Sequence, residues 1–575
     1  MQTLSGNSIN ILSPYSTNIY NILLGNRHLD PTTTREFFDP QISDLHDPYM
    51  MPDMDKAVAR ILVAREQKER IVIFGDYDVD GVSSTAILVR FLTEIGCLVS
   101  YRLPHRVHDG YGLKAYFFDE LASKGVTLVI TVDCGTRDIE PIRHAKSLGI
   151  DVIVTDHHAV PDQIPEEVIA IVNPKRKDSK YPFPSLAGAG VAFKLLHGVL
   201  IGVGSKNIKE TLIRYIDFAS LGTVADCMPI IGENRVITTL GLRQMQRSES
   251  VGLRQFLEGR EQIEGNADII GFHIGPRINA AGRMDTPLTA LRWLLAGEGR
   301  TDEFFGELEH LNETRKGTTE TQYQRALTSV DTSKSILFFD ARDLDHGIIG
   351  LVAGRLTELY NKPSIVMKNG HDHPLTSRKG DTVAIDTTAS VSEGKELSIG
   401  SCRAPEWCNL IELLDECKHF FVRYGGHRQA AGFTIETSRI PEFREAMWKA
   451  ISRVHDTANL PKKILNVECI LPISDITVAT LEQIDRFRPY GIGNPRPLWI
   501  IENVTISNTK PLGQEEKHLS ISIAEKTELK LLLWNAADKK PHLRVGNIVS
   551  LIVEIDRNEW KGKVSVQGVV RDIIV

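Results

Sequence analysis

The segment IVIFGDYDVDG at residues 71–81 places three carboxylates at alternate positions, directly after an apolar run. They are Asp76, Asp78 and Asp80. Carboxylates this close in sequence repel one another, and each disfavours ionisation of the next. A bound cation would remove that repulsion, so we expect one among these aspartates.

The order D-x-D-x-D-G also opens an EF-hand calcium loop. That loop needs a bidentate glutamate at its twelfth position and a helix in front of it. Counting from Asp76, the twelfth residue is Ile87, and residues 71–74 (IVIF) are typical of a buried strand. An EF-hand is therefore excluded.

Two further strand-like runs end in side chains that ligate metals. The run TLVITV leads to Asp133, and the run DVIVT leads to Asp156, His157 and His158. In an open parallel sheet the carboxyl ends of the strands meet at one edge, where sites form. We therefore expect these side chains to lie beside the three aspartates. Carboxylate and imidazole ligands suit Mn²⁺, Mg²⁺ or Zn²⁺.

So many carboxylates exceed the needs of one divalent ion, whereas two ions with a bridging carboxylate would use them. Paired ions ~3.5–4 Å apart cleave phosphodiesters, because they stabilise the attacking and leaving oxygens and generate hydroxide. The pattern therefore indicates a two-metal phosphodiesterase. For any one aspartate taken alone, a turn or a helix cap is an ordinary alternative, and the paired histidines could be structural.

Composition describes a globular protein of several domains. The chain has 575 residues, with 42% hydrophobic and 25% charged residues, and single cores rarely exceed about 300 residues. No apolar run approaches the roughly 18 residues of a membrane span, and residues 1–10 do not resemble a signal peptide. Seven scattered cysteines without a C-x-x-C pair favour a reducing cytoplasm. A net charge of −7 argues mildly against a nucleic-acid partner, although clustered carboxylates would mask a basic groove.

The elements that must position these ligands alternate between strand and helix. Apolar strands are predicted at residues 71–74, 98–103, 127–132, 151–155 and 168–172, with helices between them such as 82–95 and 139–148. This alternation predicts a mainly parallel sheet covered on both faces. Residues 300–330 combine charge with apolar residues at helical spacing, and a second α/β region begins at SILFFD (335–340). The short alternating strands after residue 455 favour a β-barrel of the OB type.

The predicted fold class is therefore α/β, with two α/β domains joined by a long helix and followed by an OB-like β-barrel. The expected boundaries are an N-terminal extension at 1–55, a first domain at 56–299, the helix at 300–330, a second domain at 331–454 and the barrel at 455–575.

Eight motifs follow in order along the chain. They are DYDVDG (76–81), VDCGT (132–136), TDHH (155–158), LGTVADCMP (221–229), GPRINAAGRM (275–284), HGIIGLVAGRL (346–356), YGGHRQAAGF (424–433) and RPYGIGNPRP (488–497). On these motifs the chain resembles the DHH phosphoesterase superfamily and, within it, the single-stranded-DNA exonucleases. The resemblance covers nearly the whole chain, and it implies a DHH domain, a DHH-associated domain and an OB domain.

The resemblance implies a shell for two divalent metal ions, Mn²⁺ or Mg²⁺. Its ligands would be Asp76, Asp78, Asp80, Asp133, His157 and Asp226, with Asp133 as the bridging and catalytic carboxylate. Asp226 enters through the motif alone, from a segment expected to be helical. His158 would face the scissile phosphate and orient or protonate one of its oxygens.

Substrate-binding residues are implied by the same resemblance. Arg106, Arg277 and Arg283 are planar forks suited to phosphate oxygens, with ordinary ion pairs as the alternative. Gly425 and Gly426 would form a phosphate nest, to which His427 could add a side-chain contact. The family's GSGRS-type motif is replaced by GSCRA at 400–404, so that Arg403 competes with Arg378 for the phosphate-binding position.

The implied activity is digestion of single-stranded DNA from its 5′ end to 5′ mononucleotides, in DNA repair and recombination. A narrow cleft between the two α/β domains would exclude duplex DNA. Trp534 and Trp560 could stack on bases or could lie in the barrel core. Expected partners are the single strand, a helicase and a single-strand-binding protein, with no membrane and a monomeric state. The alternatives are a DHH phosphodiesterase for short oligonucleotides or cyclic dinucleotides, and a non-catalytic strand-binding scaffold.

Overall fold

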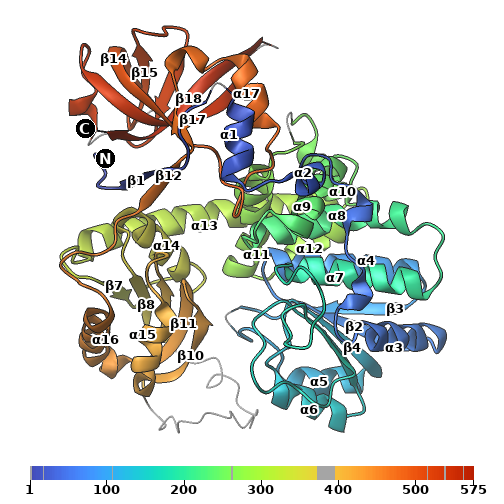
Figure 1. Ribbon diagram of the computed structural model, residues 1–575. Helices are drawn as coiled ribbons and strands as arrows, with labels where there is room; N and C mark the ends of the chain where they lie inside the picture. The colour runs from blue at the N-terminus through green and yellow to red at the C-terminus, as the bar shows by residue number, and fades with distance from the viewer. Residues whose placement is uncertain are drawn as a thin grey trace.

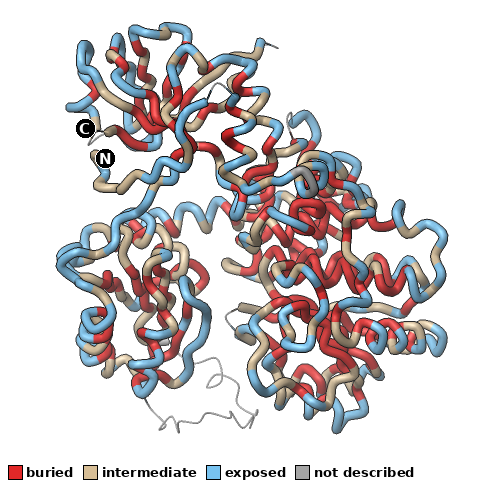
Figure 2. Tube along the Cα trace, viewed as in Figure 1, coloured by how far each residue is buried: buried red, intermediate tan, exposed pale blue. Residues whose placement is uncertain are grey.

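The long helix α13 (Thr301–Ser329) connects the two α/β domains of this protein. The computed structural model describes residues 3–16, 18–106, 108–260, 263–371, 395–513, 516–536, 539–560 and 563–574. The first domain lies at one end of α13, the second α/β domain lies at the other end, and the β-domain lies above both (Figure 1). Figure 2 shows that buried residues gather inside each of the three domains.

The first domain is built on a parallel five-stranded sheet with the order β3-β2-β4-β5-β6. The strands are β2 (Arg70–Phe74), β3 (Leu98–Arg102), β4 (Val126–Val132), β5 (Asp151–Thr155) and β6 (Ala170–Val172). All five predicted strands and the parallel arrangement are confirmed. Alternate residues of β2 enter opposite cores, since Ile71 and Ile73 pack on one face and Val72 and Phe74 on the other.

Helices cover both faces of this sheet, as predicted. One face is covered by α3 (Met54–Glu66), α4 (Val79–Glu94) and α7 (Gly188–Gly202), and the other by α5 (Ala115–Ser123) and α6 (Ile139–Ser147). A helical layer then extends the first core. It comprises α8 (Ile208–Ala225), α9 (Gly232–Met245), α10 (Val251–Leu257), α11 (Gly275–Met284) and α12 (Leu288–Leu295).

The second α/β domain has a mixed sheet with the order β10-β11-β9-β8-β7. Only β7 and β8 pair in parallel, and the remaining neighbours are antiparallel. Its elements are β7 (Leu337–Ala341), α14 (Ile349–Tyr360), β8 (Ser364–His371), β9 (Leu397–Arg403), α15 (Leu410–Glu416), β10 (Phe421–His427), β11 (Ala430–Glu436) and α16 (Ile440–Val454).

The strands of the β-domain form a closed ring. Their order is β14-β15-β16-β18-β17, and β17 pairs in turn with β14. Its elements are β13 (Cys469–Ile470), α17 (Val478–Asp485), β14 (Trp499–Leu512), β15 (His518–Ile523), β16 (Lys530–Leu533), β17 (Ile548–Trp560) and β18 (Lys563–Ile574). The predicted OB-like barrel is confirmed.

The N-terminal extension is part of the β-domain, which the sequence did not indicate. Strand β1 (Ser8–Ile11) pairs in parallel with β12 (Ile464–Val467). Helix α1 (Ile19–Asn26) buries apolar residues in the same core as Phe487, and α2 (Pro31–Phe38) contacts α9 of the first domain. The start of the chain therefore bridges two domains that are far apart in sequence. None of the described helices is long and apolar enough to cross a membrane.

Candidate active site

The predicted metal ligands meet at the carboxyl edge of the first sheet. Asp76 follows β2, Asp133 follows β4, and His157 and His158 follow β5. Their ligand atoms form three groups in which all atoms lie within 4.8 Å of one another. The groups are Asp133 with His157 and His158, Asp80 with His157 and Asp226, and Asp76 with Asp78 and Asp133. The structure thus brings together all six predicted ligands and His158.

Asp78 and Asp80 are positioned by helix termini. Asp78 caps α4, and its side chain accepts hydrogen bonds from the backbone N–H groups of Asp80 (2.9 Å) and Gly81 (3.1 Å). The carboxylate of Asp80 accepts from the N–H groups of Gly188 (2.6 Å) and Ala189 (2.7 Å) at the start of α7. The capping alternative is therefore true for Asp78, and it leaves the second oxygen of that carboxylate able to bind a cation.

His157 lies between three of the carboxylates. Its Nε2 is 3.1 Å from Asp133 Oδ1, 3.6 Å from Asp226 Oδ2 and 3.7 Å from Asp80 Oδ2. Asp226 reaches this position from the C-terminal end of α8, where it is the C-cap residue. Asp133 belongs to two of the three ligand groups, and it has a left-handed φ of 60°.

The electrostatics of the cluster fit divalent cations. Burial and the neighbouring Asp78 raise the pKa of Asp76 to about 8, and burial raises the pKa of Asp226 to about 7. Burial lowers the pKa of His157 to about 3, so its ring is neutral, as metal ligation requires. Asp76 Oδ1, Asp133 Oδ1 and both ring nitrogens of His157 are buried without hydrogen-bond partners among the described residues. Such unpartnered buried polar atoms are expected where a cation belongs.

Asp156 orients the two histidines, a role that the sequence did not reveal. Its Oδ1 accepts hydrogen bonds from the backbone N–H groups of His157 (2.7 Å) and His158 (3.1 Å) and lies 2.8 Å from Nδ1 of His158. Burial alone would lower the pKa of His158, but the hydrogen bond and the charge of Asp156 raise it above its usual value. The hydroxyl of Tyr111 lies 3.3 Å from the same ring nitrogen. His158 is therefore held beside the cluster with 44% of its side chain exposed.

An arginine cluster lies next to the carboxylates. Burial and then the charges of Arg106, Arg403 and Arg315 lower the pKa of Arg283 to about 9. These side chains come from the first domain, the second domain and the connecting helix. None of the four forms an ion pair with a carboxylate of the described chain. Such a concentration of partly exposed guanidinium groups is suited to phosphate oxygens.

Arg315 is the member of this cluster that the sequence did not single out. It lies in the charged stretch NETRKG, where nothing distinguishes it from residues on a solvated helix face. Its Nη2 donates to Asn312 Oδ1 at 3.0 Å, and its Nε is buried without a partner among the described residues. The alternative candidate Arg378 lies outside the described residues.

Arg277 is in a different environment. Its Nε forms an ion pair with Glu309 Oε1 at 2.5 Å, and its Nη1 donates to the carbonyl oxygen of His273 at 2.7 Å. This is the ion-pair alternative considered for the motif arginines.

Gly425 and Gly426 lie in the extended strand β10, paired with Gly432 and Ala431 of β11. The nest of turn conformations is therefore replaced by a strand that lacks side chains at these positions. Desolvation and then the charges of Arg403 and His158 lower the pKa of His427. His427 therefore lies close to Arg403 of the second domain and to His158 of the first domain.

A groove of about 350 Å³ begins at the arginine cluster. Its lining includes Cys227 and Met228, which follow Asp226, together with Arg283 and Arg315 and the apolar residues Phe272 and Ile492. Phe272 is 73% exposed and Ile492 is 56% exposed. The groove therefore combines guanidinium groups with apolar surface, as single-strand binding requires.

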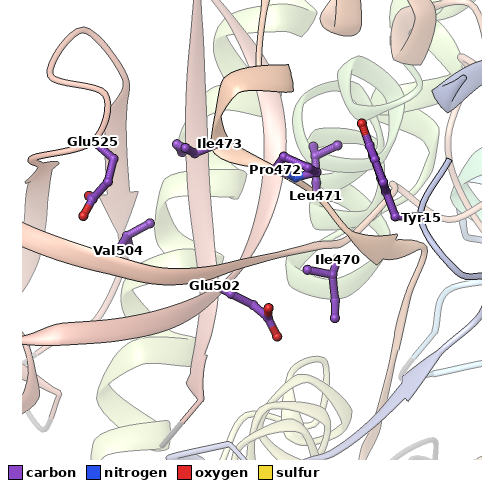
Figure 3. Close-up of a pocket in the computed structure, with 8 residues that line it drawn as sticks. All are labelled: Tyr15, Ile470, Leu471, Pro472, Ile473, Glu502, Val504 and Glu525. Atoms are coloured by element: carbon purple, nitrogen blue, oxygen red, sulfur yellow. The ribbon is translucent and has the colours of Figure 1, made fainter. Parts of the chain in front are cut away.

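A second cavity, of about 310 Å³, lies on the β-domain (Figure 3). It is lined by Tyr15, Val504, Glu502, Glu525 and residues 470–473, and it includes none of the ligand groups found among the described residues. On the same domain, Trp534 is 48% exposed beside His518, with ring centroids 4.8 Å apart. Of the two alternatives given for Trp534, the position in the barrel core is therefore wrong. The side chain of Trp560 is outside the described residues.

Comparisons with known proteins agree with this geometry. Residues 70–223 match the DHH family, N-terminal domain, and residues 467–572 match the RecJ OB domain. The chain is 30% identical to the single-stranded-DNA-specific exonuclease RecJ of Escherichia coli, over 90% of each protein. It is 31% identical to the Bacillus subtilis protein of the same name, over 94% of this chain and 66% of that relative.

The fold also matches a crystal structure of RecJ from Thermus thermophilus in complex with Mn²⁺. The TM-score is 0.80 at 26% identity, over 99% of this chain and 79% of the other. A second Thermus thermophilus RecJ structure, in complex with Mg²⁺, matches with a TM-score of 0.74. With matches in its first domain and in its β-domain, and with 30% identity over 90% of each chain, this chain belongs to the RecJ family.

Proposed function

We propose that this protein is a divalent-metal exonuclease that degrades single-stranded DNA in the 5′ to 3′ direction and releases 5′ mononucleotides. The observation that carries the proposal is the proximity of two clusters of opposite charge, since Asp78 acts on the pKa of Arg283 and Arg106 acts on that of Asp76. Six ligands suited to divalent ions lie beside four guanidinium groups that have no carboxylate partner in the described chain. A phosphodiester placed there would meet both the metal ions and the arginines.

The metal shell would consist of Asp76, Asp78, Asp80, Asp133, His157 and Asp226, with Asp133 shared by two ions of Mn²⁺ or Mg²⁺. When bound, such ions neutralise charge on phosphate oxygens and lower the pKa of water. Asp80 and Asp133 have pKa values well above their usual range because they are buried among other carboxylates. Their ionised forms therefore depend on the cations.

His158 would act on the leaving oxygen. Asp156 fixes its Nδ1 and favours the protonated ring, so the other nitrogen, Nε2, can donate a proton as the phosphodiester bond breaks. The guanidinium carbon of Arg106 lies over the ring of Tyr77, 4.0 Å from the ring centroid. Together with Arg283 and Arg403, this arginine would hold the phosphate of the terminal nucleotide so that its scissile bond lies at the metal shell.

Preference for a single strand would follow from the groove. Phe272 and Ile492 offer apolar surface to unpaired bases, whereas bases in a duplex are stacked inside the helix. Trp534 would extend this contact onto the β-domain. We further propose that the enzyme acts as a monomer in the cytoplasm, where a helicase and a single-strand-binding protein supply its substrate during DNA repair and recombination.

The test uses 5′- and 3′-labelled oligonucleotides, single-stranded and duplex, with Mn²⁺, Mg²⁺ or EDTA. We expect metal-dependent release of mononucleotides from the 5′ end of the single strand, and loss of this activity in Asp133→Asn. The matched control is Asp162→Asn, because that carboxylate is 93% exposed and pairs only with Lys177 among the described residues. Cleavage restricted to di- and trinucleotides or cyclic dinucleotides would replace the proposal with a short-substrate phosphodiesterase. Strand binding without cleavage would indicate a scaffold.

A further inference from the structure

We propose that the loop Arg488–Asn494 of the β-domain positions the metal ligand Asp226, so that contact between two domains completes the metal shell. The proposal rests on the proposed function, because it assumes that Asp226 binds a metal ion. It assigns a role to the RPYGIGN part of the RPYGIGNPRP motif.

Asp226 is the ligand with the least local support. The other ligands follow strands or begin a helix, and Asp80 accepts two backbone hydrogen bonds. The carboxylate of Asp226 has no hydrogen bond within the described chain, and 33% of its side chain is exposed. Its position therefore depends on the path of the chain that follows α8.

That path ends on the loop of the β-domain. The backbone N–H of Ile230 donates to the carbonyl oxygen of Ile492 at 2.7 Å. Gly491 lies so close to Ile230 that a Cβ at position 491 would overlap with the side chain of Ile230. A Cβ at Gly493 would lie 3.2 Å from Pro229. The four residues after Asp226 therefore lead directly into a close contact with the loop.

Arg235 fixes the same loop from the next turn of the chain. This guanidinium is only 2% exposed, and it donates to the carbonyl oxygens of Phe487 (3.4 Å), Arg488 (2.8 Å) and Pro489 (3.3 Å). Its Nε donates to Phe37 of the N-terminal extension at 2.7 Å. Because a buried guanidinium must keep its hydrogen-bond acceptors, these contacts hold α9 and the loop in one arrangement.

The loop is also rigid by itself. Gly491 and Asn494 exchange backbone hydrogen bonds of 2.9 Å and 3.1 Å, and the side chain of Asn494 donates to the carbonyl oxygens of Phe487 (2.8 Å) and Pro489 (2.9 Å). Arg27, the C-cap residue of α1, donates to Asn494 Oδ1 at 2.8 Å. A rigid loop that presses on residues 229–230 can set the position of Asp226, because only two residues separate that aspartate from Pro229.

The test compares glycine-to-alanine variants of the full-length protein. Gly493→Ala introduces a methyl group toward Pro229 at a residue with a left-handed φ of 77°. Gly546→Ala is the matched control, because Gly546 is in the same domain, has a φ of 90°, and would place its new methyl group with no neighbouring atom within 4 Å. Both variants therefore carry similar backbone strain, and only the first presses on the segment after Asp226. Asp226→Asn gives the effect of losing the ligand itself.

The measurement is calorimetric titration of the metal-free protein with Mn²⁺, with melting temperature and affinity for an oligothymidine in EDTA as parallel readouts. We expect Gly493→Ala to weaken Mn²⁺ binding at least fivefold, toward the value of Asp226→Asn, while Gly546→Ala changes it less than twofold. Oligothymidine affinity in EDTA should change less than twofold in both variants. Should Gly493→Ala fail to fold, Arg235→Lys replaces it with the same expectation.

Equal Mn²⁺ affinity in wild type, Gly493→Ala and Gly546→Ala would overturn the inference, since the loop would then only join the domains. An equal loss in both glycine variants would also overturn it, because the effect would be general strain. A wild-type protein that does not bind Mn²⁺ would instead contradict the proposed function.

Discussion

Replacing Arg283 by methionine should stabilise the metal-free protein and remove its response to phosphate. Burial and the charges of three neighbouring arginines lower the pKa of Arg283 from its usual range to about 9. Because one pKa unit corresponds to about 1.4 kcal/mol, this lowering corresponds to roughly 5 kcal/mol against the charged guanidinium. The side chain is partly exposed, so solvent screening reduces that cost to about 1–3 kcal/mol.

Some of this gain is offset by the hydrogen bond from Arg283 Nη1 to the carbonyl oxygen of Gly347 at 3.0 Å, which contributes about 1 kcal/mol. We therefore expect Arg283→Met to raise the free energy of unfolding by up to about 2 kcal/mol. Inorganic phosphate should stabilise the wild type in proportion to its binding at the cluster. The variant should lose this stabilisation and should cleave the single strand about 10–100-fold more slowly, as expected for a lost charged hydrogen-bond donor.

Thermal denaturation in EDTA, with and without phosphate, measures both effects. Arg277→Met is the matched control, because its loss leaves Glu309 unpaired. That variant should melt at a lower temperature and keep the phosphate-induced shift. An Arg283→Met protein that melts below the wild type and still responds fully to phosphate would refute the anion-binding role and make Arg283 a structural residue.

Three further outcomes are expected. In EDTA the melting temperature should fall as the pH rises from 5.5 to 8.5. Asp76 has a pKa of about 8 in the folded protein, so the folded state holds a proton that the unfolded chain has already released. Mn²⁺ should reverse this trend, and a melting temperature that does not change with pH in EDTA would contradict the prediction. Lys194 and Glu233 form a fully buried ion pair of 3.0 Å. Lys194→Met leaves the charge of Glu233 buried and unpaired, and it should lower the free energy of unfolding by about 3–5 kcal/mol. A denaturant midpoint equal to that of the wild type would show that the pair is dispensable. Trp534→Ala should weaken binding of a 20-nucleotide oligothymidine about 5–150-fold, because it removes one stacking platform, and it should leave trinucleotide cleavage unchanged. Fluorescence anisotropy measures the binding, and an affinity equal to that of the wild type would show that Trp534 does not contact the strand.

The architecture followed closely from local sequence patterns. Buried parallel strands require continuous apolar runs, so β2, β4 and β5 could be placed from residues 71–74, 127–132 and 151–155 alone. Since the ends of parallel strands share one edge, the sequence also predicted that Asp76, Asp133 and the two histidines would meet. Asp226 required the family motif, because a helix C-terminus carries no signal that it approaches a distant sheet.

The partners of charged side chains were decided by tertiary structure. Arg277 and Arg283 belong to the same helical motif, yet Arg277 faces Glu309 while Arg283 lies among other arginines. Arg315 joins that cluster only because α13 packs across α11. The choice between an ion pair and an anion site depends on which charge another element brings within a few ångströms, and local sequence does not contain that information.

The sequence by itself therefore determined the elements and the kinds of ligand, because both depend on residue type and short-range spacing. Only the tertiary structure placed the N-terminal extension in the β-domain and brought residues 488–494 against the chain that follows Asp226. These contacts join segments separated by more than 250 residues, and they depend on shape complementarity between surfaces that form only after each domain has folded.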